Sequence, residues 1–310
     1  MVSLDNLSAE DLQASITNRN PLLEKEVGSW HTFVQVNGAK GYFKEQSHRA
    51  RQSFNSYGLT IGAFKEIDRN LMAGVLFGAQ KHNASIGHTG KLIGESVLFG
   101  PFMSWAKNNW HVDTSLTWTN TSYLSSRYDM SGNSLTGHYG GSDLAGYFNL
   151  GYDIHMSGAL QGLTLEPMIE LLYQYSELGG FHETGNSMFA LKVGKRRRFQ
   201  SATRVGLNMG YLLKDLENPT ELGVTFGFQK QSSGRQHGNY GYLNNVQGPD
   251  AAASSDIAYD SPSSSANSVF YGLRFRRLLT GSSTIKLEFS GVKGNRERAE
   301  SLQVVIEKKI

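Results

Sequence analysis

The 310 residues carry a formal net charge of +3, which is too small to indicate a protein that binds nucleic acid. The chain contains no cysteine, so disulfides and thiolate metal sites are excluded. No stretch reaches the roughly 18 consecutive apolar residues of a membrane helix. A barrel strand, however, exposes only every second residue to lipid, and 35 Gly, 11% aromatic residues and 6 Pro are typical of a strand-rich chain.

The first segment, residues 1–28, has a helical pattern. Ser8 is a favourable N-cap before an acidic first turn, and helix-forming residues continue to Glu26, with Pro21 expected to end or kink the helix. Leucine and isoleucine recur at helical spacing, at Leu4, Leu7, Leu12 and Ile16. The chain opens without the basic and apolar residues of a signal peptide, so we expect a longer natural precursor.

From Trp30 onward the apolar period changes to two, which predicts β-strands. The clearest row alternates Trp110, Val112 and Thr114 with polar residues. Twelve such rows follow one another, beginning near residues 30, 59, 71, 97, 110, 144, 165, 205, 222, 269, 285 and 302. Residues 29–310 are therefore predicted to form twelve strands.

The connections between these rows alternate in length. Longer polar loops, the longest from 232 to 267, lie between short turns at residues 68–70, 107–109, 157–159, 215–219 and 280–282. This alternation is the pattern of a bacterial outer-membrane barrel, whose short turns are periplasmic and whose longer loops are extracellular. We predict an antiparallel transmembrane β-barrel of about twelve strands, with both ends on the periplasmic side and the N-terminal helix in the lumen.

A soluble β-sandwich or soluble barrel is the alternative fold, since its strands also alternate. The second face of these rows is rich in Gly, Thr, Ser and scattered charges, and the apolar rows end in aromatic residues, as lipid-facing rows do at membrane interfaces. The predicted lipid-facing aromatics are Trp30, Trp110, Trp118, Tyr173 and Tyr175.

Several segments, in this order, resemble autotransporter (type V secretion) translocator domains. They are the strand Leu163–Tyr175 with its proline and tyrosines, the F-x-E motif at Phe181–Glu183, the A-L-x-V type strand Phe189–Val193, and the glycine-centred strand Ser201–Tyr211. Trp30 after a helix and the ending from Lys286 also match, so that the resemblance covers nearly the whole chain. The family usually ends in an aromatic residue whereas this chain ends in Ile310, which puts its recognition by the assembly machinery in doubt.

The resemblance implies an outer-membrane domain that exports an N-terminal passenger to the cell surface through, or with the help of, a twelve-stranded barrel whose lumen ends up holding a helix. The implied partners are the passenger, the barrel assembly machinery, and outer-membrane lipid and lipopolysaccharide, and we expect a monomer. A small-solute outer-membrane channel with an N-terminal plug is the alternative function.

The alternation places charges of both signs in the lumen. They could form a track for an extended passenger and a socket for Arg19, Glu24, Lys25 and Glu26, or simply solvate a wet pore. The predicted lumen-facing polar residues are Asp113, Asp143, Glu166, Glu170, Arg204, Arg274, Arg276 and Lys286.

We expect no cofactor, no metal and no enzyme activity. Outer-membrane phospholipases with twelve strands use Ser and His on one face, but here His111 and Ser115 both point inward, away from lipid. Neither a G-x-S-x-G nor an H-E-x-x-H motif is present in a suitable context. The basic run 195–198 could bind lipopolysaccharide at the outer rim, or could be a solvated strand extension or turn.

The resemblance also raises self-cleavage as a hypothesis, because some autotransporters release the passenger when a helix asparagine cyclises. The paired Asn-Asn of that subgroup is absent, and Pro21 hinders scission after Asn20. The remaining candidates are Asn18 as the cleavage site, with Asp113, Glu166 and Glu170 as the inward carboxylates.

Overall fold

The computed structural model describes residues 20, 22–23, 26–45, 50–185, 189–214, 218–234, 236–242, 257–261, 264–295 and 297–310. Over these residues the chain is almost entirely β-structure. Twelve long strands form the wall: β1 (Trp30–Phe43), β2 (Gln52–Glu66), β3 (Leu71–Ile86), β4 (Gly90–Lys107), β5 (Trp110–Tyr128), β6 (Ser134–Tyr152), β8 (Leu163–Leu178), β11 (Arg196–Leu213), β12 (Thr220–Ser233), β15 (Ser264–Thr280), β16 (Ser283–Gly294) and β17 (Glu297–Lys309). The predicted number of strands is confirmed.

The remaining elements are short and lie in the connections between wall strands. They are β7 (Ile154–His155), a 3-10 turn η1 (Gly158–Leu160), β9 (Phe181–His182), β10 (Leu191–Val193), β13 (Gln236–Tyr242) and β14 (Ile257–Ser261). The hairpin of β13 and β14 falls within residues 232–267, which the sequence pattern had assigned to a loop.

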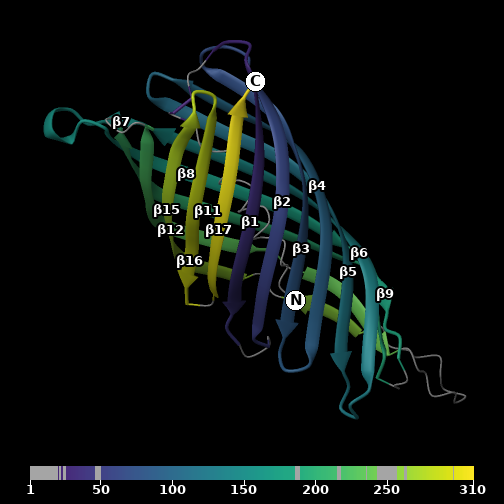
Figure 1. Cartoon of the computed structure of the whole chain (residues 1–310). Helices are drawn as coiled ribbons and strands as arrows, with labels where there is room; N and C mark the ends of the chain where they lie inside the picture. The colour runs from purple at the N-terminus through teal and green to yellow at the C-terminus, as the bar shows by residue number, and fades with distance from the viewer. Residues whose placement is uncertain are drawn as a thin grey trace, which may run out of the picture.

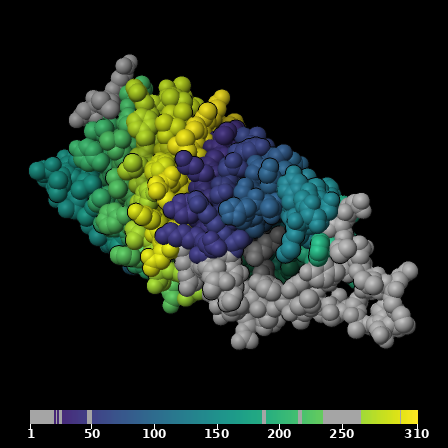
Figure 2. Space-filling view, turned by 90° about the horizontal axis from the view of Figure 1, so that it is seen from below, coloured from purple at the N-terminus to yellow at the C-terminus, as the bar shows by residue number. Residues whose placement is uncertain are grey.

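The sheet closes on itself because the first strand pairs with the last. β1 and β17 are antiparallel, from His31 opposite Lys309 to Phe43 opposite Glu297, and the Ile310 N–H donates to the Trp30 carbonyl at 2.8 Å. Figure 1 shows β1, in purple, beside β17, in yellow, and Figure 2 shows the same seam on the surface. Closure removes the unpaired edges of an open sheet, as a structure surrounded by lipid requires.

Alternation along each strand sorts side chains between the two faces of the wall. On β5, Leu116 and Trp118 are about half exposed on the outside, while Asp113 and Thr117 are buried on the inside. Apolar residues outside and polar residues inside are the reverse of a soluble sandwich. The predicted aromatics Trp30, Trp110, Trp118 and Tyr173 are exposed on this outer face, and Tyr175 packs there against Phe199 with ring centroids 4.8 Å apart.

The two ends of the barrel differ. At one end, here called the terminal end, lie the start of β1, the end of β17 and the turns after β2, β4 and β15, including Asn108 and Asn109 with positive φ, as a two-residue hairpin turn requires. The short connections between β3 and β4 and between β16 and β17 lie at the opposite end. The opposite end, called the loop end, carries the connections that contain β9, β10, β13 and β14.

Apolar side chains also pack inside the wall. Phe33, Phe64, Leu76, Leu98, Phe102 and Val305 form a cluster on β1–β4 and β17, and a second cluster around Phe54, Tyr123 and Tyr139 lies nearer the loop end. A side chain at Gly62 would collide with the Phe33 ring, so glycine lets this ring lie against the wall.

The predicted N-terminal helix lies largely outside the described residues, since 1–19, 21 and 24–25 are not among them. The described residues Asn20, Leu22, Leu23 and 26–29 form turns and irregular chain rather than a helix. Within the described parts of the chain, no helix is both long and apolar enough to cross a membrane.

Candidate functional site

The interior of the barrel holds the polar side chains that the strand alternation had assigned to the lumen. Asp113, Asp143, Arg276 and Lys286 are almost fully buried there. The other four, Glu166, Glu170, Arg204 and Arg274, are partly buried on the same inner face. All eight therefore lie inside, and the structure adds which of them contact one another.

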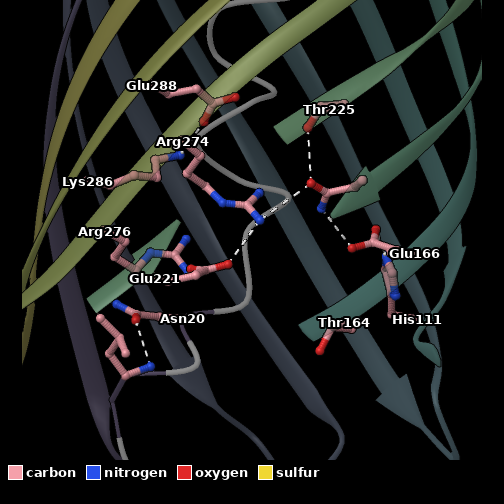
Figure 3. A network of polar contacts seen from close by, with 12 residues as sticks. Asn20, His111, Thr164, Glu166, Glu221, Thr225, Arg274, Arg276, Lys286 and Glu288 are labelled. Carbon is pink, nitrogen blue, oxygen red and sulfur yellow. Dashed lines mark hydrogen bonds and ion pairs between the residues drawn. The ribbon is translucent and has the colours of Figure 1, made fainter. Parts of the chain in front are cut away.

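A network on β5, β6, β8 and β11 is centred on Glu166. Its Oε1 lies 2.9 Å from Nε2 of His111, and both residues are labelled in Figure 3. Its Oε2 accepts a hydrogen bond from Nδ2 of Asn208 at 2.9 Å. Asn149 donates to Asp113 Oδ2 at 3.2 Å. The contacts of Asn208 and Asn149 join neighbouring strands, whereas the His111–Glu166 contact reaches from β5 to β8 across β6, which lies between them.

The network continues through arginine–glutamate pairs on β12 and β15. Arg274 and Arg276 reach the two oxygens of Glu221 at 3.0 and 2.8 Å, and Figure 3 shows both arginines directed at this carboxylate. Glu221 was not among the predicted lumen residues, although its alternation with Leu222 was the signal that could have found it. A buried charge is strongly unfavourable without a partner, so these pairings allow the charges to remain in the wall.

Further ion pairs complete this half of the interior. Arg204 lies 3.5 Å from Glu170, which also accepts a hydrogen bond from the Tyr147 hydroxyl at 3.1 Å, and Lys286 lies 3.1 Å from Glu288. The charged side chains thus contact other wall residues, which favours a role in wall structure.

The chain preceding β1 is held inside the barrel at Asn20. The Asn20 side-chain nitrogen donates to Thr284 Oγ1 at 2.6 Å and to Glu307 Oε2 at 2.9 Å. The other oxygen of Glu307 lies 3.3 Å from Nδ1 of His31, whose Nε2 is 3.4 Å from Glu66. Buried contacts therefore connect residue 20 to β1, β2, β16 and β17.

Leu23 gives the same segment an apolar attachment. Its side chain is buried and lines a pocket together with Asn20, Phe64, Met72 and Glu307 at the terminal end. The polar contact at Asn20 and the apolar contact at Leu23 thus hold the segment against the same part of the inner wall.

A turn at 26–29 carries the chain from the interior to the first strand. The Gly28 N–H donates to the Glu66 carbonyl at 2.7 Å, and Gly28 adopts φ +90°, which favours glycine. Exposed Glu26 lies 2.9 Å from Lys309, and this ammonium lowers the pKa of the Glu26 carboxyl. Glu26 is therefore at the rim rather than in a lumen socket; Arg19, Glu24 and Lys25 lie outside the described residues.

The basic run 195–198 is divided between the two faces of the wall. Lys195 and Arg197 contact Glu177 on β8, whereas Arg198 is buried and Arg196 lies over the inward-facing ring of Tyr139 at 5.6 Å. The run therefore lies at the start of strand β11, in agreement with the interpretation as a strand extension, and its residues Arg196 and Arg198 face inward.

The F-x-E motif fastens the β8–β11 connection to the wall. Phe181 stacks on Tyr139 with centroids 4.6 Å apart, and Glu183 accepts two hydrogen bonds from Arg127, at 2.8 and 2.7 Å. Glu183 also accepts a hydrogen bond from the Leu191 N–H at 2.9 Å. The two motif residues thus hold this connection against β5 and β6.

The candidates for self-cleavage are not brought together among the described residues. Asn18 lies outside them, and Asp113, Glu166 and Glu170 contact Asn149, His111, Asn208, Tyr147 and Arg204 as given above. Over the described part of the chain, no group of three or more His, Asp or Glu is arranged to hold a metal ion.

Comparison with known proteins agrees with this architecture. Residues 32–290 match the family model described as autotransporter beta-domain. Esterase EstA of Pseudomonas aeruginosa and that of Pseudomonas putida are each 29% identical over 192 residues, which are 60% of this chain but 30% of either esterase. The chain therefore spans about a third of the length of these relatives.

Solved structures show the same fold. The translocator domain of autotransporter NalP from Neisseria meningitidis has a TM-score of 0.74 at 12% identity, covering 98% of this chain and 94% of that one. The beta domain of the Bordetella autotransporter BrkA has a TM-score of 0.69 at 13% identity, covering 92% and 100%. Because the family model covers most of the residues, this chain belongs to the autotransporter beta-domain family.

Proposed function

We propose that this outer-membrane translocator domain exports a passenger, joined upstream of its first residues, to the cell surface through the barrel. The observation that carries the proposal is the attachment of Asn20 inside the barrel, to Thr284 and Glu307, in the segment that leads into β1. The polypeptide that joins a passenger to this segment would therefore run through the lumen. Residues 1–28 are then the linker, and residues 29–310 the barrel that holds it.

The orientation follows from the two ends of the barrel. Both ends of the wall lie at the terminal end and the two longest connections, β8–β11 and β12–β15, lie at the loop end, which supports the pattern of outer-membrane barrels with a periplasmic terminal end. The loop end, with β9, β10, β13 and β14, then faces the outside of the cell, and the C-terminus is periplasmic.

The barrel itself is proposed to be non-catalytic. Its curated relatives are named as esterases, but this chain spans 30% of their length, and the matched part is the beta-domain. The carboxylates Asp113, Glu166 and Glu170 act in this proposal as structural members of the inner wall, each through its contacts with neighbouring strands.

The proposed partners in the membrane are the barrel assembly machinery and lipopolysaccharide, with the barrel acting as a monomer. Lys195 and Arg197, on the outer face at the loop end, are the basic groups that a lipid phosphate would meet, although Glu177 already neutralises part of their charge.

Conductance of the purified barrel in a planar bilayer tests the proposal. If residues 1–27 occupy the lumen, the intact barrel conducts little, and their removal opens a larger and steadier pore. Equal conductance with and without the segment would contradict a lumenal linker. The same recording addresses the alternative function, a small-solute channel with a plug, because a channel conducts well when intact.

A further inference from the structure

One side of the inner wall lacks charged side chains. This neutral wall comprises the inward residues of β1 from Phe33 to Phe43, of β2 from Gln52 to Phe64, of β3 and β4, and of β17 from Ala299 to Val305. The charged interior residues lie mainly on β5, β6, β8, β11, β12, β15 and β16, where they pair with one another. The two sides of the lumen therefore offer different chemistry to a chain between them.

A layer of amide and hydroxyl side chains crosses the neutral wall between its two apolar clusters. The strand register aligns its members, with Gln303 opposite Asn37, Gln80 opposite Ser96, and Ser96 opposite Thr121. We call this set, with its neighbours, the amide layer. Its members are Gln35, Asn37, Ser56, Thr60, Gln80, Ser96, Gln303, and Thr121 on β5, and all are buried.

Gly58 allows the layer to be continuous across β2. A Cβ at this position would lie 2.6 Å from Cγ of Gln80 and 2.9 Å from Oδ1 of Asn37. Side chains from β1 and β3 therefore lie over the β2 backbone where glycine leaves room. Any larger residue would displace these two amides.

Part of the layer has hydrogen-bonding capacity that the wall does not use. Neither amide atom of Gln80 has a hydrogen-bond partner among the described residues, and the same holds for the hydroxyls of Ser56 and Thr60. Leaving such groups buried without partners is unfavourable, so they are suited to a polar group that enters the lumen.

We propose that the amide layer binds the main chain of the passenger while it is threaded through the lumen. An amide side chain donates and accepts hydrogen bonds, as does each peptide unit of an extended chain, so the match does not depend on passenger sequence. A wall of free charges would instead hold side chains of opposite sign. This inference rests on the proposed function, since it requires the passenger to pass through the barrel.

Disulfide trapping tests the contact directly. The chain has no cysteine, so Gln80→Cys or Thr60→Cys introduces a unique thiol, and Thr225→Cys on β12 is the matched position on the charged side. The probe is the full chain with a reporter fused upstream. Each version of the reporter has one cysteine at a different position, and the reporter includes a tightly folded domain that stalls export. We expect cross-links to the reporter to be several-fold more abundant at positions 80 and 60 than at 225.

Cross-links that are equal at all three positions, or stronger at 225, would overturn the proposal. So would cross-linking of positions 80 and 60 to thiols placed within residues 1–19 but not to the stalled reporter, because the linker would then be the ligand. If instead no stalled reporter spans the membrane at all, the proposed function itself fails, which is a distinguishable result.

Export kinetics give a second test that does not depend on trapping. Gln80→Leu should slow the appearance of the reporter at the surface several-fold, whereas Gln80→Asn should restore most of the rate. Gln80→Glu should make the rate depend on the net charge of the reporter. Thr225→Val is the control with unchanged export, and heat-modifiable mobility on gels verifies that each barrel has folded. Export of the Gln80→Leu variant at the original rate would overturn the proposal.

Discussion

Asn20 Nδ2 donates a hydrogen bond of 2.9 Å to Oε2 of Glu307, a residue 287 positions further along the chain. The contact joins the segment before the first strand to the last strand, inside a barrel that those two strands close. Since His31 lies against the other oxygen of Glu307, the linker and the seam between β1 and β17 depend on the same carboxylate.

Replacing Asn20 by Ala should release the linker while the barrel stays folded. The change removes three hydrogen bonds: the side-chain nitrogen donates to Thr284 and to the Glu307 carboxylate, and the side-chain oxygen accepts the Leu22 N–H at 3.1 Å. A hydrogen bond to a charged group contributes about 1.5–3 kcal/mol. Amide exchange at Leu22 and Gly28 should accelerate about tenfold or more. Asn55→Ala, at an exposed position on β2, is the control with unchanged exchange at these sites. Equal protection in both variants would show that Asn20 does not hold the linker.

The sequence predicted the faces of the wall much better than the contacts on them. A period of two assigns Asp113, Glu170 and Arg204 to the inside whatever the register, because the alternation of a strand depends only on local geometry. Which glutamate meets which arginine depends on the stagger between strands, and the pairing of Glu221 with Arg274 and Arg276 appears only when β12 and β15 are aligned.

Two motifs show the same limit. The basic run 195–198 could be a rim patch or a strand extension, and its actual division between two faces follows from the position where β11 begins. The F-x-E motif carried the family resemblance, but its physical meaning needed the partners Tyr139 and Arg127, both more than 40 residues away. Contacts at that separation leave no periodic signal in a single sequence.

Acidification should loosen the turn at 26–29. Lys309 lowers the pKa of the Glu26 carboxyl below its ordinary value of 4.5, so the ion pair contributes above that pH and is lost as pH falls through the lowered value. The chemical shift of the Glu26 carboxyl carbon, followed by NMR, should titrate below 4.5. Lys309→Gln should return the midpoint to the ordinary value, and a midpoint unchanged by this variant would contradict the pairing.

The direction of side chains on β5 can be tested with two arginines. Leu116→Arg places a charge on the outer face and should destabilise the inserted barrel by about 2–4 kcal/mol near the membrane midplane. Thr119→Arg lies on the inner face opposite Asp143, where a cation has a carboxylate partner, and should be tolerated. Urea unfolding in lipid vesicles measures both, and a larger loss for Thr119→Arg would mean that the assigned faces are inverted.

Removing the Glu183 charge should release the β8–β11 connection. Glu183→Gln weakens the paired hydrogen bonds with Arg127, and because Arg127 is partly exposed we expect a local loss of only about 1 kcal/mol. Trypsin should then cut more quickly at exposed Lys192 in folded barrels. Glu95→Gln, which disrupts only the exposed pair with Lys81 between β3 and β4, serves as the control, and equal cleavage in both variants would exclude a fastening role for the motif.

The linker should remain uncut at Asn18. Cyclisation requires the side-chain nitrogen of Asn18 to attack its own carbonyl, which is slow unless a carboxylate within hydrogen-bond reach assists. Two residues span at most about 7 Å, and the carboxylate that contacts nearby Asn20 is Glu307, whose oxygens already meet Asn20 and His31. The inward carboxylates Asp113, Glu166 and Glu170 have partners in the wall.

Mass spectrometry of the barrel purified from cells that make the full precursor measures this outcome. We expect a chain that continues upstream through Asn18. A barrel that begins at Arg19 would contradict the expectation, and the variants Asn18→Asp and Glu166→Gln would then separate cyclisation from proteolysis. Cyclisation would be blocked by the first change and slowed by the second if Glu166 assists it, whereas cleavage by a separate protease would continue in a folded Glu166→Gln barrel.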